Sequence, residues 1–406
     1  DPPSFKRNLA KLIATNQGEN RGNLRQVVKN ILSKRNKIMK IVKKFPSPFY
    51  LIDELELKDS AVTFYRCFTK YIKNFYPFYA MKSNSHHEIV KRVITYGFGV
   101  DVSSGKELQE ALSCGAKKIL YTGPGKTLCE IELAVRNNEK VTINIDSFRE
   151  LEKIDIITRK LRKRICVGVR IFTRFHGSWT KFGISINDLA VFWRKAIQCP
   201  FVELEGIQAH MSWNKTVEPY QLVLKELSDY LKKNFTTTML GEIKFIDFGG
   251  GFLPHNSTGY YPCKLPQGNL LKTVGDFSSE QPLFKDKYYI SQAIKIEDYA
   301  KGISATIDKF IRPLVNCKFY AEPGRIICHK AMHVILKIVD VKKSWCAIAD
   351  GGINIIGWER FETEYYPVIN LTNPSLKEKK FKIFGSLCTP RDEWGSYCYT
   401  SKIKEG

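Results

Sequence analysis

The amino-acid sequence predicts an α/β protein in which a (β/α)8 barrel, a TIM barrel, is followed by a smaller β domain. Its 406 residues are more than one ordinary small domain needs. From residue 78 onward, eight short runs rich in β-branched and aromatic residues alternate with segments that have the apolar spacing of amphipathic helices. Buried strands that alternate with helices form a parallel sheet, and eight such units close into a barrel.

The predicted strands and helices follow one another along the chain. The strands are FYAMK (78–82), GFGVDV (97–102), KILYTG (118–123), VTINID (141–146), CVGVRI (166–171), EGIQAH (205–210), FIDFGGG (245–251) and FYAEPG (319–324). The helices are expected at residues 86–96, 104–115, 129–138, 147–161, 186–198 and 217–234. Residues 252–318 are rich in glycine and proline before a further helical stretch, and we expect an extended connection there.

The segments on either side of the barrel are predicted to form separate parts. Residues 1–45 carry twelve Lys or Arg against two acids, and their apolar residues recur at helical spacing. We expect a basic helical extension packed on the body; the alternative is a docking helix for an anionic partner. Residues 46–60 are predicted to add a strand to the β domain, 61–330 to form the barrel, and 331–406 to form the C-terminal β domain, beginning with a hairpin at 332–352.

Composition limits the class of protein. No run approaches 18 apolar residues and no signal peptide is recognisable, so we expect a cytoplasmic protein without membrane contact. The net charge of +23 is explained either by solvated basic faces or by an acidic partner, and no nucleic-acid motif is found. Eleven cysteines, odd in number and without a C-x-x-C pair, indicate reduced thiols rather than a zinc site or disulfides.

Polar residues stand at the carboxyl ends of the predicted strands, where barrels of this kind carry their chemistry. Any one of them could simply solvate a loop, but the whole set is hard to explain in that way. The set is Lys82, Asp101, Gly123 to Gly125, Asp146, Arg170, His210, Gly249 to Gly251 and Glu322.

These side chains together describe a pocket for pyridoxal 5′-phosphate. A partly desolvated Lys82 amine can form a Schiff base with an aldehyde. The glycine triplet offers unobstructed backbone N–H groups for a phosphate, and Arg325 supplies a guanidinium suited to bidentate phosphate binding. His210 provides a flat ring for stacking, and Glu322 a carboxylate that would keep the pyridine nitrogen protonated.

The motifs resemble those of the alanine-racemase-fold (group IV, fold type III) pyridoxal-phosphate decarboxylases, which include ornithine, diaminopimelate and biosynthetic arginine decarboxylases. The resemblance runs from about residue 46 to the end and rests on FYAMKSN, GVDVSSGKEL, GPGKT, VRI, IQAH, DFGGGF, AEPGR, IADGGIN and GSLCTPRD. It implies pyridoxal phosphate on Lys82, with Asp101, Arg170, His210, Gly249, Gly250, Gly251, Glu322 and Arg325 binding the cofactor.

The resemblance also implies a homodimer with sites at its interface. Cys388 would reach into the partner subunit's site and help return a proton after carbon dioxide leaves. The substrate would be contacted by Glu107, Thr389, Asp392 and Arg360. The sequence does not predict the direction of the Arg360 side chain.

Three departures from the family pattern concern the substrate and the phosphate. An acid that follows the cysteine in ornithine and diaminopimelate decarboxylases is Thr389 here, a variant similar to members from siderophore and antibiotic pathways, which act on citryl or carrier-linked substrates. HMSWN puts Trp213 after the histidine, where a glycine and a phosphate-binding serine are usual. The final GAY motif, whose tyrosine binds phosphate, is missing, so the C-terminal domain is predicted to be incomplete.

We therefore expect a decarboxylase that removes the α-carboxylate of an amino acid or of an amino-acid-derived substrate, without a metal ion. One alternative is a catalytically silent homologue with a regulatory role, and another is a racemase on the same fold. The basic charge fits a substrate tethered to an acidic carrier protein.

Overall fold

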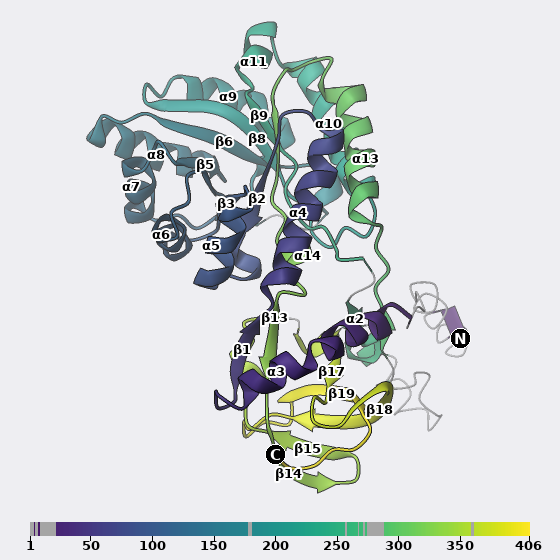
Figure 1. Ribbon diagram of the computed structural model, residues 1–406. Coiled ribbons are helices and arrows are strands. Elements are labelled where there is room, and N and C mark those ends of the chain that lie inside the picture. The colour runs from purple at the N-terminus through teal and green to yellow at the C-terminus, as the bar shows by residue number, and fades with distance from the viewer. Residues whose placement is uncertain are drawn as a thin grey trace. The chain divides into compact units, whose positions relative to one another are not determined.

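The computed structural model describes residues 4, 7–8, 22–177, 181–255, 258–266, 268–270, 273, 288–358 and 361–406 (Figure 1). The chain divides into two compact units. The barrel unit comprises Ile52–Leu253 and Ile294–Met332, and the β unit comprises Asp1–Leu51, Pro254–Ala293 and His333–Gly406. Among the described helices, none is both long enough and apolar enough to cross a lipid bilayer.

Eight parallel strands form a closed barrel, as the alternating pattern predicts. They are β2 (Phe75–Ala80), β3 (Gly99–Val102), β4 (Ile119–Tyr121), β5 (Val141–Ile145), β6 (Ile165–Phe172), β8 (Val202–Ala209), β9 (Phe245–Asp247) and β12 (Lys318–Ala321). The order around the sheet is β5-β4-β3-β2-β12-β9-β8-β6, and a pairing of β5 with β6 closes the ring. A short strand, β7 (Ile184–Ser185), pairs with β6 as well.

The barrel closes through its last strand. Phe319 of β12 lies opposite Phe75 of β2 on one side and opposite Ile246 of β9 on the other, both in parallel register. Strands distant in sequence therefore become neighbours, and the carboxyl ends of all eight meet at one end of the barrel.

Helices surround the strands of the barrel unit (Figure 1). They are α4 (Glu54–Tyr71), α5 (His87–Thr95), α6 (Gly105–Ser113), α7 (Leu128–Arg136), α8 (Phe148–Leu161), α9 (Leu189–Ile197), α10 (Glu218–Asn234), α11 (Thr237–Glu242), α13 (Ile296–Thr306) and α14 (Arg325–Cys328). Several begin at a capping side chain: Ser104, Thr127 and Ser147 each accept a hydrogen bond from a backbone N–H in the first helical turn.

Helix α4 occupies residues that the sequence pattern assigns partly to a strand. The strand there, β1 (Phe49–Ile52), is only four residues long, and Asp53 caps the helix by accepting a hydrogen bond from the backbone N–H of Glu56. Phe64 and Phe68 of α4 are fully buried and stack at 4.3 Å between ring centroids. Leu57 is buried on the same face, so the apolar face extends into residues 54–60 and favours a helix there.

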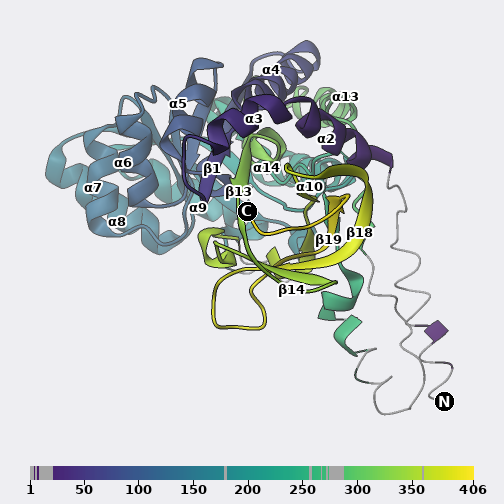
Figure 2. The ribbon, with the colours of Figure 1, turned by 60° about the horizontal axis from the view of Figure 1, so that its bottom comes forward.

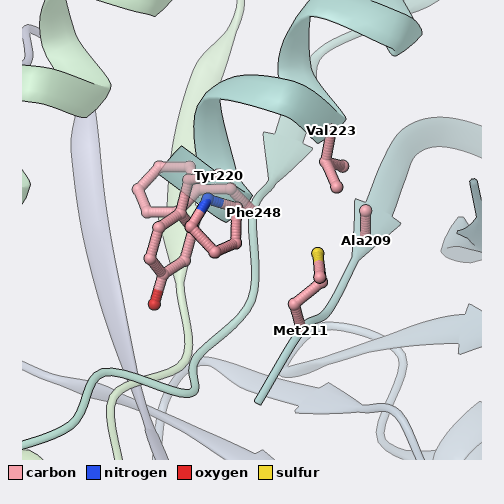
Figure 3. A pocket seen from close by; sticks show the side chains of 6 residues that line it. Ala209, Met211, Tyr220, Val223 and Phe248 are labelled. Carbon is pink, nitrogen blue, oxygen red and sulfur yellow. The ribbon is translucent and has the colours of Figure 1, made fainter. Parts of the chain in front are cut away.

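A small apolar pocket lies beside β8 and α10 (Figure 3). Its lining is Ala209, Met211, Pro219, Tyr220, Val223 and Phe248, and its volume is about 10 Å³. That is about the space of one water molecule, so the pocket is a packing void.

The β unit is built on a five-stranded sheet in the order β14-β15-β18-β19-β17. Its strands are β14 (Ile338–Lys343), β15 (Cys346–Ala349), β17 (Val368–Ile369), β18 (Pro374–Phe384) and β19 (Glu393–Thr400), of which β18 and β19 are the longest (Figure 2). Strands β14 and β15 are antiparallel and form the predicted hairpin.

Two smaller sheets complete the β unit. Strand β1 pairs with β13 (Met332–Ile335), while β10 (Gly259–Tyr260) lies between β11 (Tyr289–Ile290) and β16 (Glu364–Tyr365). The long connection before the eighth barrel strand thus contributes two short strands of its own.

The basic N-terminal segment contains two helices, α2 (Gly22–Ser33) and α3 (Arg35–Val42). Leu24 is fully buried in a cluster with Tyr261, Tyr288, Ile290 and Tyr365. Arg35 Nε donates a hydrogen bond of 2.5 Å to the carbonyl oxygen of Leu371. One face of α2 is therefore covered within the β unit. Residues 9–21, which carry part of the predicted basic helix, lie outside the described residues.

Candidate active site

The predicted site residues of the barrel unit gather at the carboxyl ends of its strands. Lys82 lies in a 3-10 turn, Met81–Ser83, directly after β2. Its neighbour Met81 is fully buried, but the Lys82 side chain is exposed. The exposure arises because β2 ends at Ala80 and Lys82 lies beyond its buried part, so partial desolvation of the Lys82 amine stays a prediction.

Glu322 is the buried centre of the site. It directly follows β12, is 1% exposed, and places its Oε2 3.3 Å from His210 Nδ1. Gln208 Nε2 donates to Oε1 at 3.2 Å. Burial alone would raise the pKa of Glu322, but His210 and the Lys82 ammonium outweigh it and hold the pKa at about 2. Glu322 is therefore ionised at neutral pH.

His210 directly follows β8 and is buried beside Glu322. The Gly250 N–H donates to its Nδ1 at 3.0 Å, and its Nε2 lies 3.1 Å from Ser212 Oγ. Burial, reinforced by the positive charge of Lys82, lowers the pKa of His210 to about 4. The low pKa favours a neutral ring at pH 7, whose Nδ1 faces both the Gly250 N–H and the Glu322 carboxylate.

Two further buried acids lie close to Glu322. Neither carboxyl oxygen of Asp101 has a hydrogen-bond partner among the described residues, whereas Asp247 Oδ1 accepts from the Gly249 N–H at 2.8 Å. Burial, and then the charge of Glu322, raises the pKa of both Asp101 and Asp247 well above the usual range. The pKa of Glu322 is thus lowered while those of the two neighbouring acids are raised, which disfavours like charges in one buried site.

Arg170 lies on β6 beside Asp146, a predicted strand-end residue, and beside Phe182, which was not predicted. Its Nη1 lies 3.8 Å from Asp146 Oδ1, and its guanidinium carbon lies 4.3 Å from the Phe182 ring centroid. His176, buried nearby, accepts at Nδ1 from the Thr173 N–H at 3.0 Å. The sequence predicts Arg170 as a cofactor contact, and the structure places it in a buried ion pair.

The glycine triplet follows β9 and packs closely against two other strand ends. Gly249 and Gly251 have φ angles of +74° and +80°. A Cβ on Gly250 would lie 2.1 Å from the carbonyl oxygen of Glu322, and one on Gly251 2.0 Å from that of Met211. The Gly249 and Gly250 N–H groups already donate to Asp247 and His210. Within the triplet, the Gly251 N–H is therefore the backbone donor that would bind a phosphate.

Trp213 and Arg325 form a stacked pair. The guanidinium carbon of Arg325, the first residue of α14, lies 4.2 Å from the centroid of the Trp213 ring. Trp213 has a φ of 64°, an uncommon backbone conformation for a bulky residue. The HMSWN departure thus places an indole directly on the arginine predicted to bind phosphate.

Glu107 has a structural contact of its own. It lies in the first turn of α6, and its Oε2 accepts a hydrogen bond from the Ser103 N–H at 2.6 Å. Burial raises its pKa, while the Ser103 N–H and then the charge of Lys82 act in the opposite direction. Glu107 therefore shares the electrostatic surroundings of Lys82.

A buried ion pair supports the strand ends and was not predicted. Lys126 Nζ donates to Glu150 Oε1 at 2.7 Å, to the carbonyl oxygen of Gly123 at 2.6 Å and to that of Asn144 at 2.9 Å. The Lys126 side chain is 0% exposed and that of Glu150 5%. The pair ties the GPGK loop to β5 and α8.

The predicted residues of the β unit lie in and near the loop between β18 and β19. Cys388 and Thr389 are exposed there. Asp392 is 1% exposed, and its two oxygens accept from the N–H groups of Ile353 and Leu387, each at 2.7 Å. We therefore propose a structural role for Asp392 in place of the predicted substrate contact. Arg360 lies outside the described residues.

The family profile described as "Pyridoxal-dependent decarboxylase, pyridoxal binding domain" matches residues 59–329. The chain belongs to the pyridoxal-dependent decarboxylases. Among curated relatives, the diaminopimelate decarboxylase of Methanothermobacter thermautotrophicus is 27% identical over 91% of this chain and 81% of its own length. The diaminopimelate decarboxylase of Methanocaldococcus jannaschii is 24% identical over 91% of this chain and 81% of its own length.

Solved structures share the fold. A diaminopimelate decarboxylase from M. jannaschii in co-complex with L-lysine superposes with a TM-score of 0.73 at 23% identity, covering 91% of this chain and 82% of that one. A lysine/ornithine decarboxylase from Vibrio vulnificus complexed with putrescine superposes with a TM-score of 0.69 at 19% identity. The match covers 92% of this chain and 90% of that one. The predicted alanine-racemase-like fold is confirmed.

The barrel unit of this pyridoxal-dependent decarboxylase fits its cofactor. The orphaned oxygens of Asp101 mark a buried polar site. The same strand ends carry an ionised carboxylate, Glu322, and a neutral imidazole, His210. These are groups that a protonated pyridine ring and its flat face require.

Proposed function

We propose that Lys82 holds pyridoxal 5′-phosphate and that the enzyme removes the α-carboxylate of an amino acid. The observation that carries the proposal is the buried, ionised Glu322 beside His210, in the electrostatic field of Lys82. When bound, the cofactor supplies an electron sink for the electron pair that remains after carbon dioxide leaves.

The chain's own residues then have distinct tasks. Glu322 would hold a proton on the pyridine nitrogen, and the His210 ring would stack on the cofactor. Arg325, which stacks on Trp213, and the Gly251 N–H would bind the phosphate. Asp101 and Arg170 would complete the cofactor site.

The proton that replaces the carboxylate has two candidate donors. Lys82 is one, and Cys388 of a second copy of the chain is the other, which makes the active form a homodimer with composite sites. An exposed Cys388 on a loop fixed by buried Asp392 supports this assignment.

The substrate class follows from the relatives and from one departure. Curated relatives are named diaminopimelate decarboxylases, which favours an α-amino acid with a second polar group at its far end. Thr389 stands where those enzymes carry an acid in the family pattern, so we place citryl and carrier-linked amino acids beside diaminopimelate, lysine, ornithine and arginine as candidate substrates.

One experiment tests the function directly. Purified protein loaded with pyridoxal phosphate is given this panel, with carbon dioxide release and the visible absorbance band of the bound cofactor as readouts. We expect release with at least one substrate, and loss of both readouts in Lys82→Ala. A bound cofactor without release would favour a silent homologue, and inversion of the substrate without release would favour a racemase.

The basic charge bears on the carrier-linked alternative. With a net charge of +23, encounter with an acidic carrier would be accelerated at low salt. A kcat/KM that is independent of salt for every substrate in the panel would contradict a carrier-linked substrate.

A further inference from the structure

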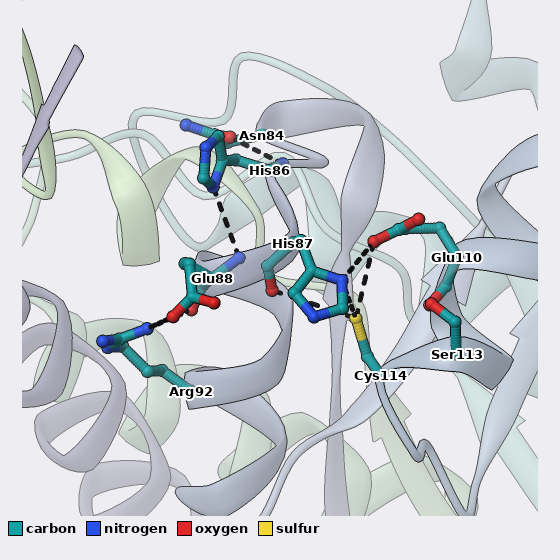
Figure 4. Close-up of polar contacts among 8 residues, drawn as sticks. All are labelled: Asn84, His86, His87, Glu88, Arg92, Glu110, Ser113 and Cys114. Atoms are coloured by element: carbon teal, nitrogen blue, oxygen red, sulfur yellow. Dashed lines mark hydrogen bonds and ion pairs between the residues drawn. The ribbon is translucent and has the colours of Figure 1, made fainter.

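Three side chains with metal-ligating atoms meet outside the active site, where α5 begins and α6 ends (Figure 4). His87 is the first residue of α5, and Cys114 caps the carboxyl end of α6 one turn after Glu110. The Cys114 Sγ lies 3.3 Å from His87 Nδ1 and 3.7 Å from Glu110 Oε1, and the two latter atoms are 2.6 Å apart. The imidazole, thiol and carboxyl groups therefore face one another.

These distances are close to those of a tetrahedral zinc site. With ordinary zinc–ligand bonds, sulfur lies about 3.6 Å from nitrogen or oxygen, and nitrogen about 3.4 Å from oxygen. The two sulfur distances already agree to within a few tenths of an ångström. Only the 2.6 Å contact between His87 and Glu110 must open, and both side chains have room, being 45% and 36% exposed.

The charges of the cluster suit a cation. The Glu110 carboxylate is an anion, and the Cys114 thiol would become a second anionic ligand when its proton passes to solvent on metal binding. Lys91 is the nearby positive charge that the ion must tolerate.

We propose that His87, Glu110 and Cys114 bind one divalent transition-metal ion of borderline softness, such as zinc or cobalt, with water in the fourth position. The cysteine spacing gives no hint of such a site, because the ligands are assembled from the two helix ends rather than from a C-x-x-C pair. The ion would tie the first turn of α5, five residues after Lys82, to α6.

Cobalt(II) alone is the probe of choice, because its thiolate complexes absorb in the near ultraviolet. The full-length reduced protein, freed of metal, is titrated with cobalt chloride. We expect one equivalent to produce a sulfur-to-cobalt band together with the visible bands of a tetrahedral ion. Zinc should displace it, since both metals share the same ligands.

Matched variants locate the site. Cys114→Ser should lose the sulfur-to-cobalt band, and His87→Gln and Glu110→Gln should each lower the affinity at least tenfold. Cys129→Ser removes another exposed cysteine, and His86→Asn removes the adjacent imidazole while keeping a residue able to cap α5. Both controls should keep the wild-type band.

The proposal is overturned if the wild-type protein gives no thiolate band, or if the band survives Cys114→Ser. Should Cys114→Ser fail to fold, the same decision rests on His87→Gln and Glu110→Gln, whose side chains are 45% and 36% exposed. Thermal unfolding provides a second readout: one equivalent of zinc should raise the Tm of the wild-type protein and leave that of His87→Gln unchanged.

Discussion

At the scale of single residues, Glu322 is expected to govern the chemistry through its charge. Glu322→Gln keeps the side chain's shape but removes the carboxylate that the site holds ionised at a pKa of about 2. We expect carbon dioxide release to fall by about 100-fold, while the cofactor band remains.

The matched control for that change is Glu203→Gln, which removes a carboxylate from the surface ion pair with Arg164. Glu203→Gln should leave the rate within about twofold of wild type. A full rate in Glu322→Gln would refute the assigned role.

His210 should make the protein sensitive to acid. An unfolded histidine has a pKa of about 6.5, whereas folded His210 has one of about 4. Between these values the unfolded chain binds a proton that the folded chain does not, so acidification favours unfolding by about 3 kcal/mol.

Urea unfolding at several pH values measures this contribution. The wild-type protein loses unfolding free energy as the pH falls from about 7 to about 4. In His210→Gln this loss should be smaller by about 3 kcal/mol. Titrating groups that do not contact His210 are present in both proteins and cancel in the difference, and Glu322→Gln in both backgrounds removes the contribution of Glu322, whose pKa His210 lowers. Parallel pH profiles for the two proteins would contradict the assignment.

Among site residues, sequence alone finds those that stand at strand ends and belong to recognisable motifs. Lys82, His210 and Glu322 are of this kind, and the structure brings them close enough for each to affect the pKa of a neighbour. Gln208 was missed because it lies inside an apolar strand, where a single polar residue gives little signal. Asp247 could have been found, since it ends β9 and stands two residues before the glycine triplet.

At the scale of elements, the buried Lys126–Glu150 pair should stabilise the loop after β4. Lys126→Met leaves the Glu150 carboxylate buried without its cation, and we expect a loss of about 3–5 kcal/mol in the free energy of unfolding. Lys160→Met is the control, because Lys160 pairs with Glu132 at 3.4 Å while 65% exposed.

The control should cost less than about 1 kcal/mol, since exposed ion pairs contribute little. Denaturant unfolding of both variants, with unchanged m-values, gives the comparison. Equal losses in the two variants would show that burial of the first pair has no energetic consequence.

The elements themselves were predicted unevenly, for a physical reason. All eight barrel strands are present, because buried parallel strands are short, uniformly apolar and bounded by turns. Helix α4 was missed because its first residues follow a true strand without a glycine or proline between them, and only the cap at Asp53 marks the change.

At the scale of the whole molecule, the proposed homodimer predicts complementation between inactive chains. Each proposed site combines Lys82 of one chain with Cys388 of a second copy. Lys82→Ala and Cys388→Ala therefore remove different residues of the same site. If subunits exchange freely, an equal mixture should recover about one quarter of wild-type carbon dioxide release, because half of the dimers carry one intact site.

Each variant alone sets the baseline for this measurement. A mixture that stays at the sum of the two baselines, under conditions where labelled subunits are seen to exchange, would exclude a Cys388 supplied by the partner. Size-exclusion chromatography with light scattering reports the assembly independently.

The pairing of β12 between β2 and β9 also has a consequence for synthesis on the ribosome. Strand β2 emerges early, yet one of its edges stays unpaired until residues 318–321 have been translated. Throughout that interval the nascent chain exposes two open parallel edges, which are prone to pairing with other chains. The productive yield in a cell should therefore depend on how well chaperones shield an incomplete barrel while its closing strand is still being made.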